Sequence, residues 1–386
     1  MFDLIDVPNS YLFQVTWDVG RRCNYDCTYC GSGRHNNWSP HASLDSLIDT
    51  ADFVLEYCDL YVKHRKVKEI NLNFTGGEPT TNKNLMGLFK YIRQQHRDYK
   101  ITIALTTNGA FPDKMLPEMK RLVNQITVSY HCEASDAIKL PIQERIFKIH
   151  EMGIELQVNV MMHQDHEFFK ECQELCYKLK DRNIQYVPRV IGDHEEDIGT
   201  PRSHKYNDEQ MLWLRNHWSE NKDSLTNTEN ANKNHCTGAY GASHKSEQNK
   251  IGIDEGRPCC GSRVMCTVNK KKRELTRFIN RTNFKDWYCS VNWFFLHINQ
   301  EAQLVFHHQS CQARFDHRRG PIGPLRKRDK IIADLKQKLE TGTLDLIKCP
   351  NTFCGCGICT PKSSDKEKLM NALPQHFNIE VLNDKN

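Results

Sequence analysis

Three cysteines within eight residues are the feature of this sequence best suited to carry chemistry. Cys23, Cys27 and Cys30 follow an apolar, strand-like segment, and the next cysteine, Cys58, comes 28 residues later inside a helical pattern. A structural zinc ion or an electron-transfer iron-sulfur cluster takes four protein ligands. The triplet therefore predicts an iron-sulfur site with one position open to a small molecule, with zinc binding or a chance grouping as the alternatives.

A glycine-rich turn, Gly76-Gly77-Glu78-Pro79, ends the next strand pattern of the chain. Glycine has no Cβ, so its backbone can approach a ligand closely and leave its N–H and C=O groups available to bind it. The turn is thus a candidate ligand-binding segment. A plain strand-to-helix turn is the alternative.

The Cys-x3-Cys-x2-Cys spacing, the aromatic Tyr29 before the third cysteine and the glycine-rich turn together resemble the radical S-adenosylmethionine (SAM) enzymes. This resemblance implies that Cys23, Cys27 and Cys30 hold a [4Fe-4S] cluster and that SAM occupies the open iron position. Reduction then cleaves SAM to methionine and a 5′-deoxyadenosyl radical, which takes a hydrogen atom from the substrate. An electron donor such as flavodoxin or ferredoxin is the implied partner.

The elements that must position these residues alternate regularly from residue 11 to about 220. Strand and helix patterns follow each other in six β/α units. The predicted strands are 11–17, 69–74, 101–106, 125–129, 154–161 and 184–190, and the predicted helices are 44–62, 84–96, 112–123, 136–151, 166–180 and 208–218. This pattern alone is compatible with either a partial barrel or an open doubly wound sheet. The resemblance implies a partial (β/α)6 TIM-like barrel.

Polar residues gather where these predicted strands end, which is the edge where parallel α/β folds build their sites. We expect Gly76, Gly77 and Glu78 to bind SAM, as the resemblance implies, and we add three strand-end residues as further SAM contacts: Asn108, Ser129 and Arg189. Each of those three could instead be a turn or capping residue. His131 and Glu133 are expected to form a hydrogen-bonded surface pair rather than to act in catalysis.

A second group of cysteines lies near the C-terminus, where nine of the 17 fall between Cys259 and Cys359. A β-hairpin pattern, a helical pattern and a glycine-spaced cysteine segment resemble the SPASM/twitch extension of many radical SAM enzymes, although the hairpin has Ala302 where glycine is usual. The resemblance implies one auxiliary [4Fe-4S] cluster. Its expected ligands are Cys289, Cys311, Cys356 and Cys359; Cys349 and Cys354 keep other ligation or a second cluster open, and zinc is the competing metal.

The expected organisation is a radical SAM barrel over residues 8–220, a polar bridge or lid over 221–256, an α+β cysteine-rich auxiliary domain over 257–362 and a tail over 363–386. Residues 1–10 lack the features of a secretory signal, and no segment has the apolar length of a membrane helix. We therefore expect a cytoplasmic protein without a membrane partner. In a reducing compartment, abundant cysteine favours metal binding over disulfides.

Charge and composition place limits on the substrate. The net charge of +5 tolerates an anionic substrate, and the basic run Lys270–Arg273 lacks the interleaved aromatic residues that stack on bases, so nucleic acid is not expected. The predicted function is oxidation of, or bond formation on, a small metabolite through hydrogen abstraction by a radical SAM oxidoreductase. The alternatives are a peptide-modifying maturase and a non-catalytic iron-sulfur or zinc electron-transfer module. No catalytic side chain is assigned.

Overall fold

The computed structural model describes residues 4–6, 12–30, 35–65, 67–191, 206–220, 265–268, 271–274, 284–305, 323–324, 327–349 and 361–373. Six parallel strands form its centre and are neighbours in chain order. They are β2 (Leu12–Asp18), β3 (Glu69–Thr75), β4 (Lys100–Thr107), β5 (Gln125–His131), β6 (Glu155–Met162) and β7 (Gln185–Val190). The parallel α/β sheet predicted from the alternating pattern is confirmed.

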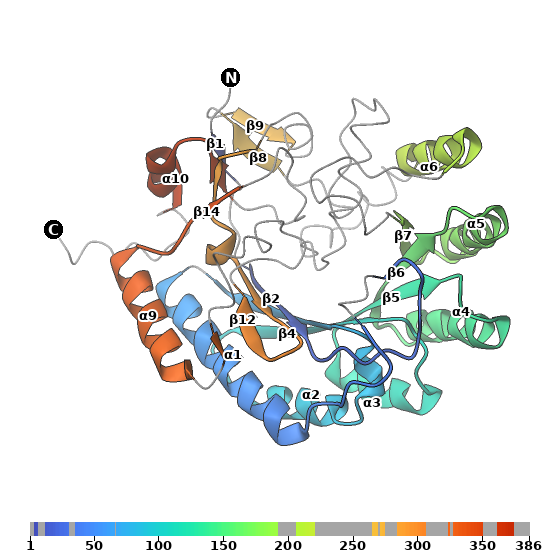
Figure 1. Ribbon diagram of the computed structural model, residues 1–386, viewed down its shortest axis with the longest axis horizontal. Coiled ribbons are helices and arrows are strands. Elements are labelled where there is room, and N and C mark those ends of the chain that lie inside the picture. The colour runs from blue at the N-terminus through green and yellow to red at the C-terminus, as the bar shows by residue number, and fades with distance from the viewer. Residues whose placement is uncertain are drawn as a thin grey trace.

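Helices cover one face of this sheet (Figure 1). They are α1 (Leu44–His64), α2 (Leu85–Gln94), α3 (Leu116–Leu122), α4 (Asp136–Glu151), α5 (His166–Asp181) and α6 (Asp208–Glu220). Side-chain caps fix where two of them begin: the Ser43 hydroxyl accepts from Ser46 N at the start of α1, and Asp165 accepts from Glu167 N and Phe168 N at the start of α5. Each cap fixes the residue at which its helix begins, and with it the end of the loop that precedes the helix.

The two faces of the sheet differ in chemistry. Successive side chains of a strand point to opposite faces, and in β3 the residues Ile70, Leu72 and Phe74 belong to the hydrophobic core beneath the helices. The alternate positions across the sheet are polar yet buried: Thr16, Asp18, Asn71, Asn73, Thr75, Thr102, Thr106, Gln125, Thr127, Ser129, Asn159 and Arg189. Strands of a parallel sheet are ordinarily apolar on both faces, so this polar inner face is suited to surround polar molecules.

The predicted C-terminal hairpin joins the same sheet. Its first strand, β11 (Phe295–Ile298), pairs in parallel with β2, and its second, β12 (Gln303–Val305), pairs with β11 and with β13 (Gly323–Pro324). Leu296 and Ile298 enter the hydrophobic core. The hairpin was expected from its pattern, but its place as a seventh parallel strand was not, because a local pattern does not reveal which strand a hairpin pairs with.

A smaller sheet brings distant parts of the chain together (Figure 1). Its strand order is β14 (Ile347–Lys348), β10 (Tyr288–Cys289), β15 (Lys362–Ser363), β1 (Leu4–Asp6), β8 (Met265–Val268) and β9 (Lys271–Glu274). Two α-helices follow in the C-terminal part: α9 (Arg328–Thr341), which packs against α1, and α10 (Lys366–Ala372). The predicted boundaries of the four domains stay a prediction.

Among the residues that the structure describes, none of the helices combines the length and the apolar character needed to cross a membrane.

Candidate functional site

The cysteine triplet lies on the loop that follows β2, next to the loop that follows β3. Backbone hydrogen bonds join the two loops, from Val19 N to Thr75 O (2.9 Å), from Gly77 N to Gly20 O (2.8 Å) and from Glu78 N to Arg22 O (2.8 Å). The thiols of Cys23, Cys27 and Cys30 are all partly exposed. The structure therefore brings the predicted cluster ligands beside the predicted SAM-binding turn.

Gly76 and Gly77 make this close approach possible. Gly76 has a φ of 129°, and a Cβ there would lie 2.5 Å from Gly20 O. A Cβ on Gly77 would lie 2.4 Å from both Arg21 O and Arg22 O. A Cβ atom essentially never comes this close to a non-bonded atom. The two glycines are therefore required for packing against the backbone that carries the cysteines, in addition to any role toward a ligand.

The cysteine thiols have perturbed acidity. Burial raises the pKa of Cys23 to about 11 and that of Cys27 to about 12. These thiols are therefore protonated near neutral pH unless a metal replaces the proton. They are poor free nucleophiles as they stand, and the side chains become anionic on metal binding.

The three cysteines are donors of the type that iron-sulfur clusters take. In the described part of the chain, no three His, Cys, Asp or Glu side chains converge closely enough to hold one metal ion. In a [4Fe-4S] cluster each cysteine binds a different iron, so the sulfurs are spread more widely than around tetrahedral zinc. Three soft thiolates on one partly exposed loop therefore fit a cluster held by three protein ligands.

Glu78 ties the ends of β3 and β4 together. Its buried carboxylate accepts hydrogen bonds from Thr80 N (3.0 Å), Thr80 Oγ1 (2.6 Å), Thr107 Oγ1 (2.7 Å) and Asn108 N (2.6 Å). Burial raises the pKa of Glu78, although these hydrogen bonds act in the opposite direction. Since both carboxylate oxygens accept hydrogen bonds from the protein, Glu78 holds the predicted SAM-binding turn in place through internal contacts.

Asn108 bonds to the cysteine loop itself. Its Nδ2 donates to Asn24 Oδ1 at 2.8 Å, and Asn24 lies directly after Cys23. Its Oδ1 accepts from Ala110 N at 2.9 Å. The structure thus places this predicted strand-end residue at the site, in contact with the cysteine loop.

Ser129 and Arg189 lie on the polar inner face of the sheet. Ser129 Oγ is buried and has no hydrogen-bond partner among the described residues. Arg189 is also buried, and its Nε donates to Asn159 Oδ1 at 3.1 Å. A buried hydroxyl without a partner costs free energy, so Ser129 fits a contact to a bound molecule.

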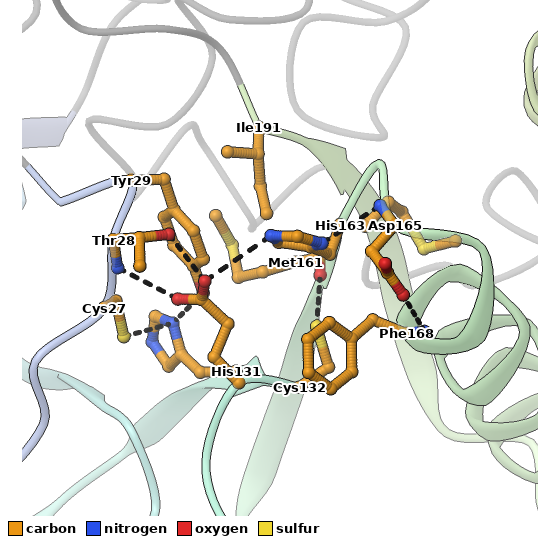
Figure 2. Close-up of polar contacts among 12 residues, drawn as sticks. Cys27, Thr28, Tyr29, His131, Cys132, Met161, His163, Asp165, Phe168 and Ile191 are labelled. Atoms are coloured by element: carbon orange, nitrogen blue, oxygen red, sulfur yellow. Dashed lines mark hydrogen bonds and ion pairs between the residues drawn. The ribbon is translucent and has the colours of Figure 1, made fainter. Parts of the chain in front are cut away.

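His131 and Glu133 correct one expectation from the sequence. Rather than bonding to each other at the surface, each contacts the cysteine loop (Figure 2). His131 Nδ1 lies 2.6 Å from Tyr29 Oη and 3.5 Å from Cys27 Sγ, while the Glu133 carboxylate accepts from Thr28. The expectation was wrong because these partners lie more than 100 residues away in the sequence.

Two further polar residues at this edge of the sheet were missed from the sequence. His297 Nε2 on β11 lies 3.0 Å from Asp18 Oδ2 at the end of β2, and both side chains are buried. Close by in the sequence, Arg21 forms an ion pair with Glu301. Asp18 carried the same strand-end signal that singled out Asn108 and Ser129, but His297 sits in an apolar hairpin pattern that gave no such signal.

Only part of the predicted auxiliary site falls within the description. Cys289 is buried at the end of β10. Cys349 follows β14, where its N–H donates to Trp287 O and its carbonyl oxygen accepts from Asp286 N, each at 2.8 Å, so it lies beside the start of β10. The other expected ligands lie outside the described residues: Cys311, Cys356 and Cys359, together with the alternative Cys354.

Comparison with known proteins agrees with this geometry. Residues 17–177 match the family model of the radical SAM superfamily. The GTP 3′,8-cyclase of Aliarcobacter butzleri is 32% identical over 117 residues, which are 30% of this chain and 33% of that protein. The GTP 3′,8-cyclase of Campylobacter lari is 27% identical over 158 residues, which are 41% of this chain and 46% of that protein. The matched segments thus span a third to just under half of these relatives.

A solved structure extends the likeness in fold. Native anSMEcpe with bound AdoMet and the Cp18Cys peptide aligns with a TM-score of 0.50 and 11% identity, covering 97% of this chain and 100% of that one. At this identity the likeness concerns the fold alone. Residues 17–177, which include the three-cysteine loop, are therefore similar to the radical SAM superfamily, whose members bind a [4Fe-4S] cluster and SAM.

Proposed function

We propose that Cys23, Cys27 and Cys30 hold the cluster and that this enzyme abstracts hydrogen from a small polar metabolite. The observation that carries the proposal is the backbone pairing of the cysteine loop with the Gly76-Gly77 turn at the carboxyl edge of the sheet. When bound, the two cofactors supply reductive cleavage of SAM to a 5′-deoxyadenosyl radical. The chain's own residues orient these cofactors and the substrate.

The proposed SAM contacts follow from the same edge. Gly76 and Gly77 present backbone groups there, and Glu78 acts from beneath by fixing Asn108. Ser129 Oγ offers a buried hydroxyl to SAM, and Arg189 offers a buried cation on the same face. A carboxylate or phosphate is the natural partner of a guanidinium, so Arg189 suits the SAM carboxylate or an anionic group of the substrate.

The inner face favours a polar substrate. Buried amide and hydroxyl side chains lose free energy unless they find hydrogen-bond partners, and a polar molecule within the barrel would supply them. The relatives named GTP 3′,8-cyclase make a nucleoside triphosphate the first substrate to test. A peptide is the alternative substrate, and a flavodoxin or ferredoxin is the proposed electron donor.

We also propose an auxiliary cluster in the C-terminal part of the chain. The support is the pairing of β10, which ends in Cys289, with β14, which Cys349 follows; the backbone of Cys349 bonds to Asp286 and Trp287 just before β10. Cys349 therefore joins Cys289, Cys311, Cys356 and Cys359 as a proposed ligand.

The test is anaerobic reconstitution with iron and sulfide, reduction with dithionite in the presence of SAM, and chromatography for 5′-deoxyadenosine. We expect about eight irons per chain, four for each [4Fe-4S] cluster, and formation of 5′-deoxyadenosine. Cys27→Ala should abolish that product while about four irons remain. SAM cleavage by Cys27→Ala, or a fully loaded wild type that forms no product, would contradict the proposal.

Cys289→Ser is the matched control, since it removes a thiol from the other proposed site. It should lose about four irons and still cleave SAM. Unchanged iron in this variant would remove the auxiliary cluster from the proposal while leaving the radical SAM assignment standing.

A further inference from the structure

Thr28, which lies between Cys27 and Cys30, forms two hydrogen bonds with a residue far away in the sequence, Glu133. Its backbone N–H donates to Glu133 Oε2 at 2.9 Å, and its hydroxyl donates to Glu133 Oε1 at 2.5 Å. A single carboxylate therefore takes both donors of one residue in the middle of the cysteine loop. Two such bonds fix the position and the rotation of the loop at this point.

Glu133 is in turn held by His163. His163 Nε2 lies 3.4 Å from Glu133 Oε1, and the two side chains are only 14% and 16% exposed. Asp165 N donates to His163 Nδ1 at 3.0 Å, so that nitrogen is an acceptor and the ring proton is on Nε2. The Nε2 side of the His163 ring thus faces the Glu133 carboxylate.

The chain of contacts ends on a rigid element. Asp165 is the N-cap of α5, where its carboxylate accepts from Glu167 N and Phe168 N. The ring of Phe168 packs edge-on against His163 at 5.2 Å between centroids (Figure 2). The cysteine loop is therefore connected through Thr28, Glu133 and His163 to the start of a 16-residue helix.

We propose that Glu133, oriented by His163, is a positioning residue that fixes the cysteine loop for cluster binding and places a negative charge beside the cluster. The inference rests on the proposed function of Cys27 and Cys30 as ligands. Groups that bond to the segment carrying metal ligands set the geometry of those ligands and tune the metal. A carboxylate near the cluster disfavours its reduced form, because reduction adds negative charge.

The test compares Glu133→Ala, Glu133→Gln and Thr28→Val with wild type after anaerobic cluster loading. Two quantities are measured: the rate of iron loss to a chelator, and the midpoint potential of the cluster from a redox titration followed by electron paramagnetic resonance. Loss of Glu133 should speed iron loss about 10- to 100-fold. Glu133→Gln should have a smaller effect, because its amide oxygen still accepts from Thr28.

The midpoint potential shows whether Glu133 places a negative charge near the cluster or only holds the cysteine loop. Both Glu133 variants should have a more positive potential than wild type, whereas Thr28→Val keeps the carboxylate and should keep the potential near the wild-type value. Glu151→Gln, which removes an exposed carboxylate at the end of α4, is the charge-matched control and should change neither quantity.

Wild-type rates and potentials in both Glu133 variants would overturn the inference. If Glu133→Ala does not fold, Glu133→Gln and Thr28→Val still decide it. A wild-type protein that loads no cluster at the cysteine triplet would overturn the proposed function, and the inference with it; a loaded wild type with unchanged variants would overturn the inference alone.

Discussion

At the scale of single residues, hydrogen bonds between distant parts of the chain hold the cysteine loop in place, from Thr28 to Glu133 and from Asn108 to Asn24. The cysteines, the glycines and Asn108 could be read from spacing and strand ends, and the structure gathers them at one edge of the sheet. Thr28 and Glu133 could not be recognised as partners, because a hydrogen bond across 105 residues leaves no local pattern. Glu78 was predicted as a SAM contact, and its four internal hydrogen bonds reveal a supporting role that no motif discloses.

Gly77→Ala is the sharpest residue-scale prediction. A methyl group there would lie 2.4 Å from two backbone carbonyl oxygens of the cysteine loop, and backbone cannot move aside as a flexible side chain can. The loop should shift, and the protein should bind substantially less iron. Gly20→Ala is the control, because a Cβ at Gly20 meets nothing within 4 Å. Iron per chain after reconstitution checks both variants, and a normally loaded Gly77→Ala would contradict the packing role.

At the scale of elements, the periodic pattern was sufficient to predict the strands and helices of the parallel α/β sheet. Predicted and observed strands and helices agree to within a few residues from β2 to α6, and the predicted helix 136–151 has the bounds of α4. The polar and apolar alternation that defines each strand also defines the two faces of the sheet. The pairing of β11 with β2 was beyond such reasoning, because sheet partners far apart in the chain are selected by packing and not by local propensity.

The hairpin turn between β11 and β12 carries the element-scale prediction. Ala302 has a φ of 52°, a left-handed conformation that costs a residue with a Cβ roughly 1–2 kcal/mol. Ala302→Gly should therefore stabilise the protein by up to about 1 kcal/mol, the rest being offset by the greater freedom of glycine when unfolded. Ala137→Gly in the first turn of α4, where the backbone is helical, should destabilise it by about 1 kcal/mol. Urea unfolding measures the free energy of unfolding of both variants. A change of the same sign in the two variants would contradict the argument.

At the scale of the whole molecule, the C-terminal part of the chain is built into the barrel sheet. Parallel pairing of β11 with β2, packing of α9 on α1 and the hydrogen bond of Tyr61 Oη to Asn292 O (2.7 Å) all connect residues near 300 with the first 65. Trp293, Leu296 and Ile298 share one hydrophobic core with the barrel. The C-terminal region is therefore coupled in stability to the first strand and helix of the large sheet, β2 and α1, and a change in one should affect the other.

The buried contact between His297 and Asp18 tests that coupling. Removing the imidazole in His297→Ala leaves the Asp18 carboxylate buried without its described partner, since Asp18 Oδ1 already has none among the described residues. Leaving a buried polar group without its hydrogen-bond partner costs about 1–3 kcal/mol, so the urea midpoint should fall. Adding Asp18→Asn replaces the carboxyl group that has lost its partner with an amide, and the double variant should be more stable than His297→Ala. A single variant as stable as wild type, or a double variant no better than the single, would show that this contact does not join the hairpin to the barrel.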